Sequence, residues 1–145
     1  MSTHIKDAHQ VHVDDDIAKS KAAIFDLIEH NELLDDDGYP TDAALDIIRL
    51  WHWSDVEGWF KFIDSVWSHG YGTWKAVDEP LYQRTEYDSE YVPRMVRRYH
   101  AATGGWSGNE SIIHAMQNNK SMLWTLTWVQ SRRGGHHTFE LKEFK

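Results

Sequence analysis

The chain of 145 residues contains no cysteine and only three prolines. Without thiols it has no disulfide, no zinc site built on thiolates and no cysteine nucleophile, which fits a reducing compartment. No stretch approaches the roughly 20 apolar residues that cross a bilayer, and the opening residues lack the apolar core of a signal peptide. We therefore expect a cytoplasmic protein with no membrane partner.

Aromatic residues, in contrast, are abundant. Hydrophobic residues make up 41% of the chain and aromatic residues 13%, with eight tryptophans, which excludes the class of chains too polar to fold. The length predicts one domain. Residues 1–16 are polar and show no periodic apolar face, so we expect a flexible polar arm over 1–16 and a single domain over 17–145.

Charge divides the chain into two unlike parts. Residues 1–64 hold 15 acidic and 5 basic residues, whereas residues 91–135 hold six basic residues and one acidic residue. An anionic ligand would therefore meet the second half, and the first half would repel nucleic acid, so we expect no duplex DNA as a partner. The alternative for the acidic residues is a solvated, solubilising surface.

Helical spacing predicts three helices in the first half. The first spans 16–33, the second begins after a Thr41 cap, and the third covers about 55–67 behind a capping box from Ser54 to Glu57. The apolar positions on the three helices are Ala18, Ala22, Phe25, Ile28 and Leu33; Ala44, Leu45, Ile48 and Trp51; and Val56, Trp59, Phe60, Ile63, Val66 and Trp67.

The second half reads mostly as strands. Residues 74–99 are extended around Pro80 and Pro93, with a strand over 92–101, and a short helix follows Ser107. Apolar residues on both faces of 122–129 predict a central strand, which a connection over 131–135 joins in a hairpin to a half-exposed strand over 137–141. The fold class is α+β, with N-terminal helices packed on a mostly antiparallel sheet that carries one inserted helix after a glycine loop.

The glycine loop over 103–110, TGGWSGNE, resembles an anion site. A second capping box, Ser107 to Glu110, opens a helix there, and the backbone amides from Gly105 to Asn109 would hold a phosphate. The loop lacks the lysine and hydroxyl pair of a Walker loop and the spacing of the dinucleotide fingerprint. The alternative is that the glycines only permit positive φ angles and that Trp106 fills the core.

The hairpin connection, SRRGGHH over 131–137, carries two arginines and two histidines. Arg132 or Arg133 would neutralise a phosphate bound at the glycine loop, with Trp106 or Tyr99 stacked on a base. This clamp requires the strands over 92–101 and 122–129 to run parallel, so that both loops lie at one edge of the sheet. The alternative is a positively charged turn in solvent.

These two motifs define the candidate site. The predicted ligand-binding residues are Tyr99, Thr103, Gly104, Gly105, Trp106, Ser107, Gly108, Asn109, Glu110, Arg132, Arg133 and His136.

Ten histidines occur, but none has a recognised metal-ligand spacing, so we predict no metal and no cofactor. We assign no catalytic residue. A nucleophilic serine, Ser107 or Ser131 with a histidine, and acid–base hydrolysis by Glu110 with a histidine remain alternatives. Four tryptophans, Trp59, Trp67, Trp124 and Trp128, sit at core spacing, whereas Trp51 and Trp53 could mark an aromatic surface.

The combination of TGGWSGNE over 103–110, a helix with an Ile-Ile pair, a Trp-rich segment ending in RRGGHH and the upstream YPTDAALDIIRLW resembles a family of small uncharacterised phage and prophage proteins. The resemblance covers roughly residues 39–141. The matching residues are those of 103–110, together with Arg133, Gly134, Gly135 and His136. It implies a viral setting, the cytoplasm of a bacterial host, and nothing about chemistry.

The first functional hypothesis is a non-enzymatic protein that captures a nucleotide or a cyclic-nucleotide-like ligand and thereby sequesters a host immune signal. The second is an acidic inhibitor of a host protein, in which residues 14–64, including Asp35, Asp36 and Asp37, imitate nucleic-acid charge. The third is an enzyme that hydrolyses the nucleotide. Self-association into a homo-oligomer is left open by the sequence.

Overall fold

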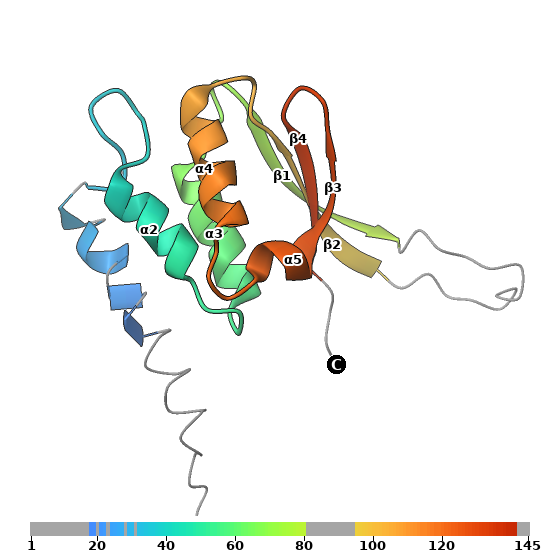
Figure 1. The fold of residues 1–145 in the computed structure, drawn as a ribbon, viewed down its shortest axis with the longest axis horizontal. Coiled ribbons are helices and arrows are strands. Elements are labelled where there is room, and N and C mark those ends of the chain that lie inside the picture. Colours follow the sequence, from blue (N-terminus) through green and yellow to red (C-terminus); the bar gives the residue numbers. More distant parts are fainter. Residues whose placement is uncertain are drawn as a thin grey trace, which may run out of the picture.

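The computed structural model describes residues 18–19, 21–22, 24–27, 29–30, 32–80 and 95–141. The predicted arm over 1–16 lies outside these residues. The elements are α2 (Asp42–Leu50), α3 (Val56–Val66), β1 (Thr73–Pro80), β2 (Met95–Ala102), α4 (Ser107–Gln117), α5 (Leu123–Thr127), β3 (Trp128–Arg132) and β4 (His136–Leu141). The predicted α+β fold class is confirmed, with the helices on one side of the sheet (Figure 1).

The first predicted helix differs from its expected register. Described residues between 18 and 29 are helical, but Phe25 is 69% exposed and Ala18 and Ala22 face solvent. Leu27 is instead the buried residue of this segment, and Ile24 packs against the core beside it. Ala18, Ala22 and Phe25 were therefore wrongly predicted to face the core, because sparse apolar residues on a helix fit more than one face. Leu33 does pack against the core, and Ile28 lies outside the described residues.

The next two helices begin where side chains satisfy their first amides. Thr41 Oγ1 accepts a hydrogen bond from the Ala44 amide at 3.2 Å, which confirms the predicted cap of α2. The cap of α3 is Asp55, whose carboxylate accepts from the Gly58 amide at 3.1 Å. The predicted capping box from Ser54 was wrong, because the Ser54 hydroxyl pairs instead with His52 Nδ1 at 2.8 Å.

The sheet has the strand order β1-β2-β4-β3, and every neighbouring pair is antiparallel. Since β2 and β3 are both antiparallel to β4, they run in the same direction, as the crossover from β2 through α4 to β3 required. The register places Ala102 opposite His136, and His136 opposite Arg132. The end of β2 and the hairpin between β3 and β4 therefore lie at the same edge of the sheet.

The predicted central strand over 122–129 was wrong. Met122 adopts a left-handed conformation with φ 66°, and the short helix α5 follows it. The buried Asn119 directs this turn, because its side-chain oxygen accepts from the Ser121 amide at 2.9 Å and from the Leu123 amide at 3.1 Å. The strand begins only at Trp128, and β3 is an exposed edge strand of the sheet.

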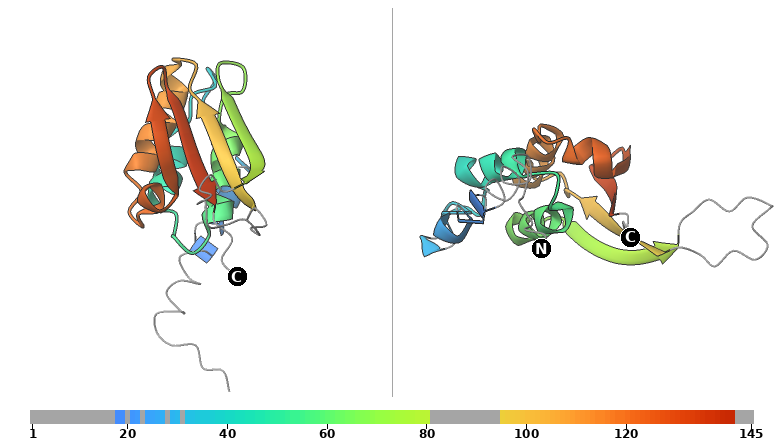
Figure 2. Two further views of the ribbon diagram at one scale, coloured as in Figure 1. Left: turned by 90° about the vertical axis from the view of Figure 1, so that its right-hand side faces the viewer. Right: turned by 90° about the horizontal axis from the view of Figure 1, so that it is seen from below.

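The core lies between the helices and one face of the sheet. The helices supply Trp59, Phe60 and Ile112, and the strands supply Tyr99 and Phe139, whose rings lie 4.1 Å and 5.8 Å from the Phe60 ring. Side chains alternate between the two faces of a strand, so the residues next to Tyr99 and Phe139 point to the opposite face. Figure 2 shows that face with no described helix over it.

Trp59 and Trp67 are buried, as predicted, and Trp51 is a core residue rather than part of an aromatic surface. Trp53 is exposed. Trp128, predicted to pack in the core, is 44% exposed at the sheet edge.

Candidate functional site

The glycine loop and the β3–β4 hairpin are in direct contact. The Thr103 amide donates to the Gly135 carbonyl at 3.0 Å. A Cβ atom added to Gly135, whose φ is +79°, would lie 2.1 Å from Thr103 Oγ1 and 3.2 Å from Glu110 Oε1. Only a glycine permits both this conformation and this approach. The two predicted motifs therefore lie together at one edge of the sheet.

Within the glycine loop, the polar groups bond to one another. The Thr103 hydroxyl donates to Glu110 Oε1 at 2.6 Å and accepts from the Gly105 amide at 3.3 Å. The Trp106 amide donates to the Thr103 carbonyl at 3.3 Å. The amides of Gly105 and Trp106, both of which were predicted to hold a phosphate, are thus bonded inside the protein.

The predicted capping box from Ser107 to Glu110 was wrong. The N-cap of α4 is Trp106, which makes no side-chain cap hydrogen bond. The Ser107 hydroxyl donates to the Tyr39 hydroxyl at 3.2 Å. The Glu110 carboxylate accepts a hydrogen bond from the Thr103 hydroxyl instead. The contact with Tyr39 ties the start of α4 to the loop before α2.

Asn109 is fully buried and joins three segments of the chain. Its side-chain oxygen accepts from the Ser68 amide at 2.9 Å, and its amide nitrogen donates to the carbonyls of Ser68 at 3.2 Å and Thr103 at 3.3 Å. A buried side chain whose hydrogen-bonding groups are all used holds backbone in place and has none left for a ligand.

Trp106 and Tyr99, the two rings predicted to stack on a base, both pack against other aromatic rings of the protein. The Trp106 ring lies between those of Tyr39 and Tyr71, with centroid distances of 4.7 Å and 5.0 Å, and packs over Gly108. Tyr99 is 6% exposed and stacks on Phe60 in the core. The predicted base stacking on Tyr99 does not fit this position, because its ring is covered by the helices.

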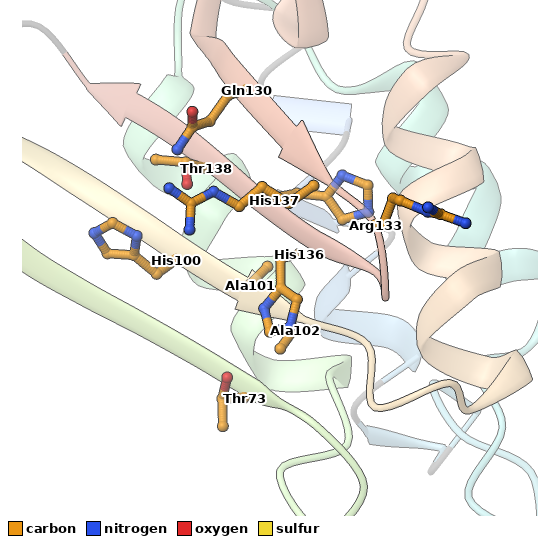
Figure 3. A pocket seen from close by; sticks show the side chains of 10 residues that line it. Thr73, His100, Ala101, Ala102, Gln130, Arg133, His136, His137 and Thr138 are labelled. Atoms are coloured by element: carbon orange, nitrogen blue, oxygen red, sulfur yellow. The ribbon is translucent and has the colours of Figure 1, made fainter.

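On the sheet face that no described helix covers (Figure 2), the hairpin borders a hollow of about 390 Å³, which we call the hairpin pocket. Figure 3 shows His100 and His136 on the strands below it, and Arg133 directed away from them at the tip. The register pairs Arg132 with His136 and Gln130 with Thr138 on this face. Its lining residues are Thr73, His100, Ala101, Ala102, Gln130, Arg132, Arg133, His136, His137 and Thr138.

Two carboxylates, those of Glu79 and Glu140, lie at the end of the pocket that carries His100. Glu79 Oε1 lies 2.9 Å from His100 Nε2, and Glu79 Oε2 lies 3.1 Å from the buried Arg98 guanidinium, which also lies 3.6 Å from Glu140. Burial alone would raise the pKa of Glu79, but the hydrogen bonds from His100 and Arg98 hold it below its usual value. Glu79 is therefore ionised and paired, while Arg132 and His136 at the hairpin end are exposed.

Of the predicted site residues, Arg132, Arg133 and His136 line the pocket, whereas Tyr99 and residues 103–110 do not. The sequence reasoning missed His100, Gln130, Thr138 and Thr73. Their signal is the alternation of β2 and β4, which places His100, His136 and Thr138 on the face opposite Tyr99 and Phe139.

Among the described residues, one group offers metal-ligating atoms within 4.8 Å of one another, namely Asp26, Glu29 and His30. All three are exposed, and His30 Nδ1 already bonds the Asp26 carbonyl at 2.8 Å, so the group gives no sign of a built site. No helix in the described part of the chain has the length and apolar character needed to span a membrane.

The fold and the pocket together define an α+β protein with a hollow, lined in part by arginines and histidines, on the sheet face opposite the described helices. Comparison with known protein families, with curated proteins and with solved structures finds no match.

Proposed function

We propose that this protein binds a small phosphate-bearing ligand, of the nucleotide or cyclic-nucleotide class, in the hairpin pocket. The observation that carries the proposal is the pairing of Arg132 with His136 at the rim of a hollow of about 390 Å³. Both side chains are exposed, so neither is committed to the core. A guanidinium bonds two phosphate oxygens at once through its planar fork, and an imidazole adds a third donor.

The size of the pocket and the polar side chains in its lining support a ligand larger than an inorganic ion. The volume falls within the range of about 300–1,000 Å³ that is common for small-molecule sites. Gln130, Thr138 and Thr73 offer neutral donors and acceptors for the hydroxyls or base edges of such a ligand. The imidazole rings of His100 and His136 offer flat surfaces for a base, the role first given to Trp106 and Tyr99.

The position of the proposed site differs from the position expected from the sequence. The glycine loop supports the hairpin through Thr103 and Gly135, and the phosphate lies on the hairpin rather than on the amides of the loop. The resemblance to phage and prophage proteins supports the further proposal that the bound ligand is a host immune signal.

Calorimetric titration with mononucleotides, cyclic dinucleotides and ADP-ribose derivatives tests the proposal. Arg132→Ala should weaken binding about 10-fold to 100-fold, since hydrogen bonds to charged groups contribute about 1.5–3 kcal/mol. Lys61→Ala, which removes a positive charge on α3 far from the pocket in sequence, is the control and should bind like the wild type. Absence of binding at millimolar concentration, or an unchanged affinity in Arg132→Ala, would overturn the proposal.

Two other functions give different results in the same experiments. Chromatography of the recovered ligand would reveal a product if the protein were a hydrolase. An acidic inhibitor would depend on the exposed loop carboxylates Asp36 and Asp37, and Arg132→Ala would leave its action intact.

A further inference from the structure

A serine and a histidine face each other across the β3–β4 hairpin, on the side of the sheet that carries Phe139. The register pairs Ser131 with His137, and Ser131 Oγ lies 2.7 Å from His137 Nδ1. The Trp128 indole nitrogen lies 2.8 Å from the same hydroxyl oxygen. Strand alternation directs these side chains to the opposite face of the hairpin from those of Arg132 and His136, and His137 also borders the hairpin pocket.

The hydrogen-bonding inventory fixes the direction of each contact. An indole nitrogen can only donate, so Trp128 uses one lone pair of Ser131 Oγ. The serine proton then points to His137 Nδ1, which accepts it when the imidazole carries its own proton on Nε2. Ser131 is exposed, and its second lone pair is left for solvent or for an electrophile.

The environment of His137 favours the neutral base. Burial lowers the pKa of His137, and the positive potential of His136 lowers it further, whereas the carboxylate of Glu110 acts in the opposite direction. Glu110 is held by the Thr103 hydroxyl at 2.6 Å, and the Trp124 ring meets the His137 ring edge-on at 6.0 Å. The Ser131 hydroxyl and the Trp124 ring therefore orient the histidine, and the negative charge of Glu110 favours its protonated form.

We propose that Ser131 and His137 form a nucleophile–base pair that reacts with activated esters. Ser131 Oγ attacks the carbonyl carbon and forms a new C–O bond while its proton passes to His137 Nδ1. The bond from the carbonyl carbon to the leaving oxygen then breaks, and the proton moves from His137 to that oxygen. The products are an acylated Ser131 and an alcohol or phenol, and water can release the acid by the same steps.

The neighbouring rings indicate the class of ester. Trp128 is 44% exposed, and its ring stacks on that of Trp124 at 6.3 Å, directly beside the serine that its nitrogen contacts. An aromatic or aliphatic group attached to the ester would bury apolar surface on this pair. We therefore expect aryl esters to react faster than small, polar esters.

A fluorophosphonate probe tests the pair directly. The serine oxygen would form a P–O bond, fluoride would leave, and His137 would take the proton, which adds a fixed mass to the protein. Intact-mass measurement followed by peptide mapping should place a single adduct on Ser131. His137→Asn should slow this labelling about 100-fold, in line with the loss of a general base.

Ser111→Ala is the matched control. Ser111 is also exposed, but its hydroxyl donates to the Ser107 carbonyl at 2.9 Å, so its removal should leave the adduct unchanged. Circular dichroism would show that each variant is folded. An adduct absent from Ser131, or formed at the same rate in His137→Asn, would overturn the proposal. Labelling needs no phosphate ligand, so failure of the proposed anion binding would leave this result readable.

Release of 4-nitrophenol from 4-nitrophenyl acetate distinguishes the two fates of the acyl group. If 4-nitrophenol is released continuously and Ser131→Ala abolishes the release, the pair hydrolyses the ester. If the release stops after one equivalent and Ser131 is found acetylated, the pair reacts once without turnover. Equal release by the wild type and Ser131→Ala would contradict an ester reaction at this serine.

Discussion

The glycine loop over 103–110 and the β3–β4 hairpin contact each other, but they differ in whether their polar side chains are buried or exposed. In the loop, Thr103 and Asn109 are fully buried; the Thr103 amide bonds the Gly135 carbonyl, and the Asn109 side chain bonds Ser68. In the hairpin, Arg132 and His136 are exposed at the rim of a pocket. The glycine loop, whose sequence most resembles a phosphate loop, therefore connects parts of the fold. The hairpin presents the side chains that can bind a ligand.

Burial explains the difference. A polar group removed from water must find a partner inside the protein, because an unpaired one costs about 1–3 kcal/mol. In the loop, Thr103, Gly108 and Asn109 are buried beside the segment that carries Ser68 and Tyr71, although Gly104 and Gly105 are exposed. In the hairpin, β3 is an edge strand whose residues are all exposed. Substitutions in the loop should therefore change stability, and those in the hairpin should change binding or reactivity.

The largest stability effect should come from Asn109→Ala. It removes three hydrogen bonds, leaves the half-buried Ser68 amide without this partner and opens a cavity at a fully buried position, so we expect a loss of about 3 kcal/mol in the free energy of unfolding. Urea denaturation measures it. Asn118→Ala, at an exposed asparagine whose amide bonds only the preceding turn, is the control and should change stability by less than about 0.5 kcal/mol. Similar losses of stability in both variants would contradict the proposal that the hydrogen bonds of Asn109 hold these segments together.

The glycines of the loop should separate into a tolerant and an intolerant position. Gly104 and Gly105 both have positive φ angles, +67° and +74°, but an added Cβ at Gly104 would lie 1.8 Å from the Tyr71 carbonyl oxygen, and one at Gly105 meets nothing within 4 Å. We expect Gly105→Ala to lose about 1 kcal/mol from the backbone conformation alone, and Gly104→Ala to lose about 2–3 kcal/mol because of overpacking. Thermal unfolding of the two variants side by side would test this order, and equal melting temperatures would contradict it.

The smallest effect should be a dependence of stability on pH that comes from the hairpin. Burial holds the pKa of His137 below its usual value of 6.5 in the folded protein, so the unfolded chain binds the proton more readily. Its contribution to stability is complete above pH 6.5 and is lost as the pH falls through 6.5 toward the folded value. Between pH 7.5 and 5.5 the urea midpoint of the wild type should fall more than that of His137→Asn. Equal falls would show that His137 titrates alike in both states.

Much of the fold could be predicted from local patterns. The Thr41 cap, the face of α3 and the hairpin between β3 and β4 each depend on short-range signals, and all three are confirmed. The common direction of β2 and β3 followed from the handed crossover between them, which brought the two loops to one edge.

The segment over 122–129 shows where such patterns fail. Its alternating apolar residues fit a buried strand, but a short apolar run fits a helix equally well. Asn119 decides between them, because it reaches back to the carbonyls of Ile48 at 2.9 Å and Trp51 at 3.1 Å while its oxygen caps the turn into α5. Contacts between residues so distant in the chain carry no local signature.

The candidate site, like the fold, could be predicted in part from local sequence and in part only from contacts between distant segments. The charge of Arg132 and Arg133 and the glycines beside them could be read from the sequence, whereas the addition of His100 from β2 required the strand register. The distinction between Arg132 and Ser131, which are neighbours in the chain but lie on opposite faces of the hairpin, also required that register.

By itself, the sequence determined the fold class, most of the helices and strands and the basic character of the hairpin, because each of these depends on residues close together in the chain. Only the tertiary structure decided that Thr103 and two amides of the glycine loop are bonded within the protein, that 123–127 is a helix and that a pocket opens on the sheet face opposite the described helices. The physical reason is that burial and hydrogen-bond partners are set by which distant segments meet, and those meetings determine whether a polar group holds the fold together or remains available to a ligand.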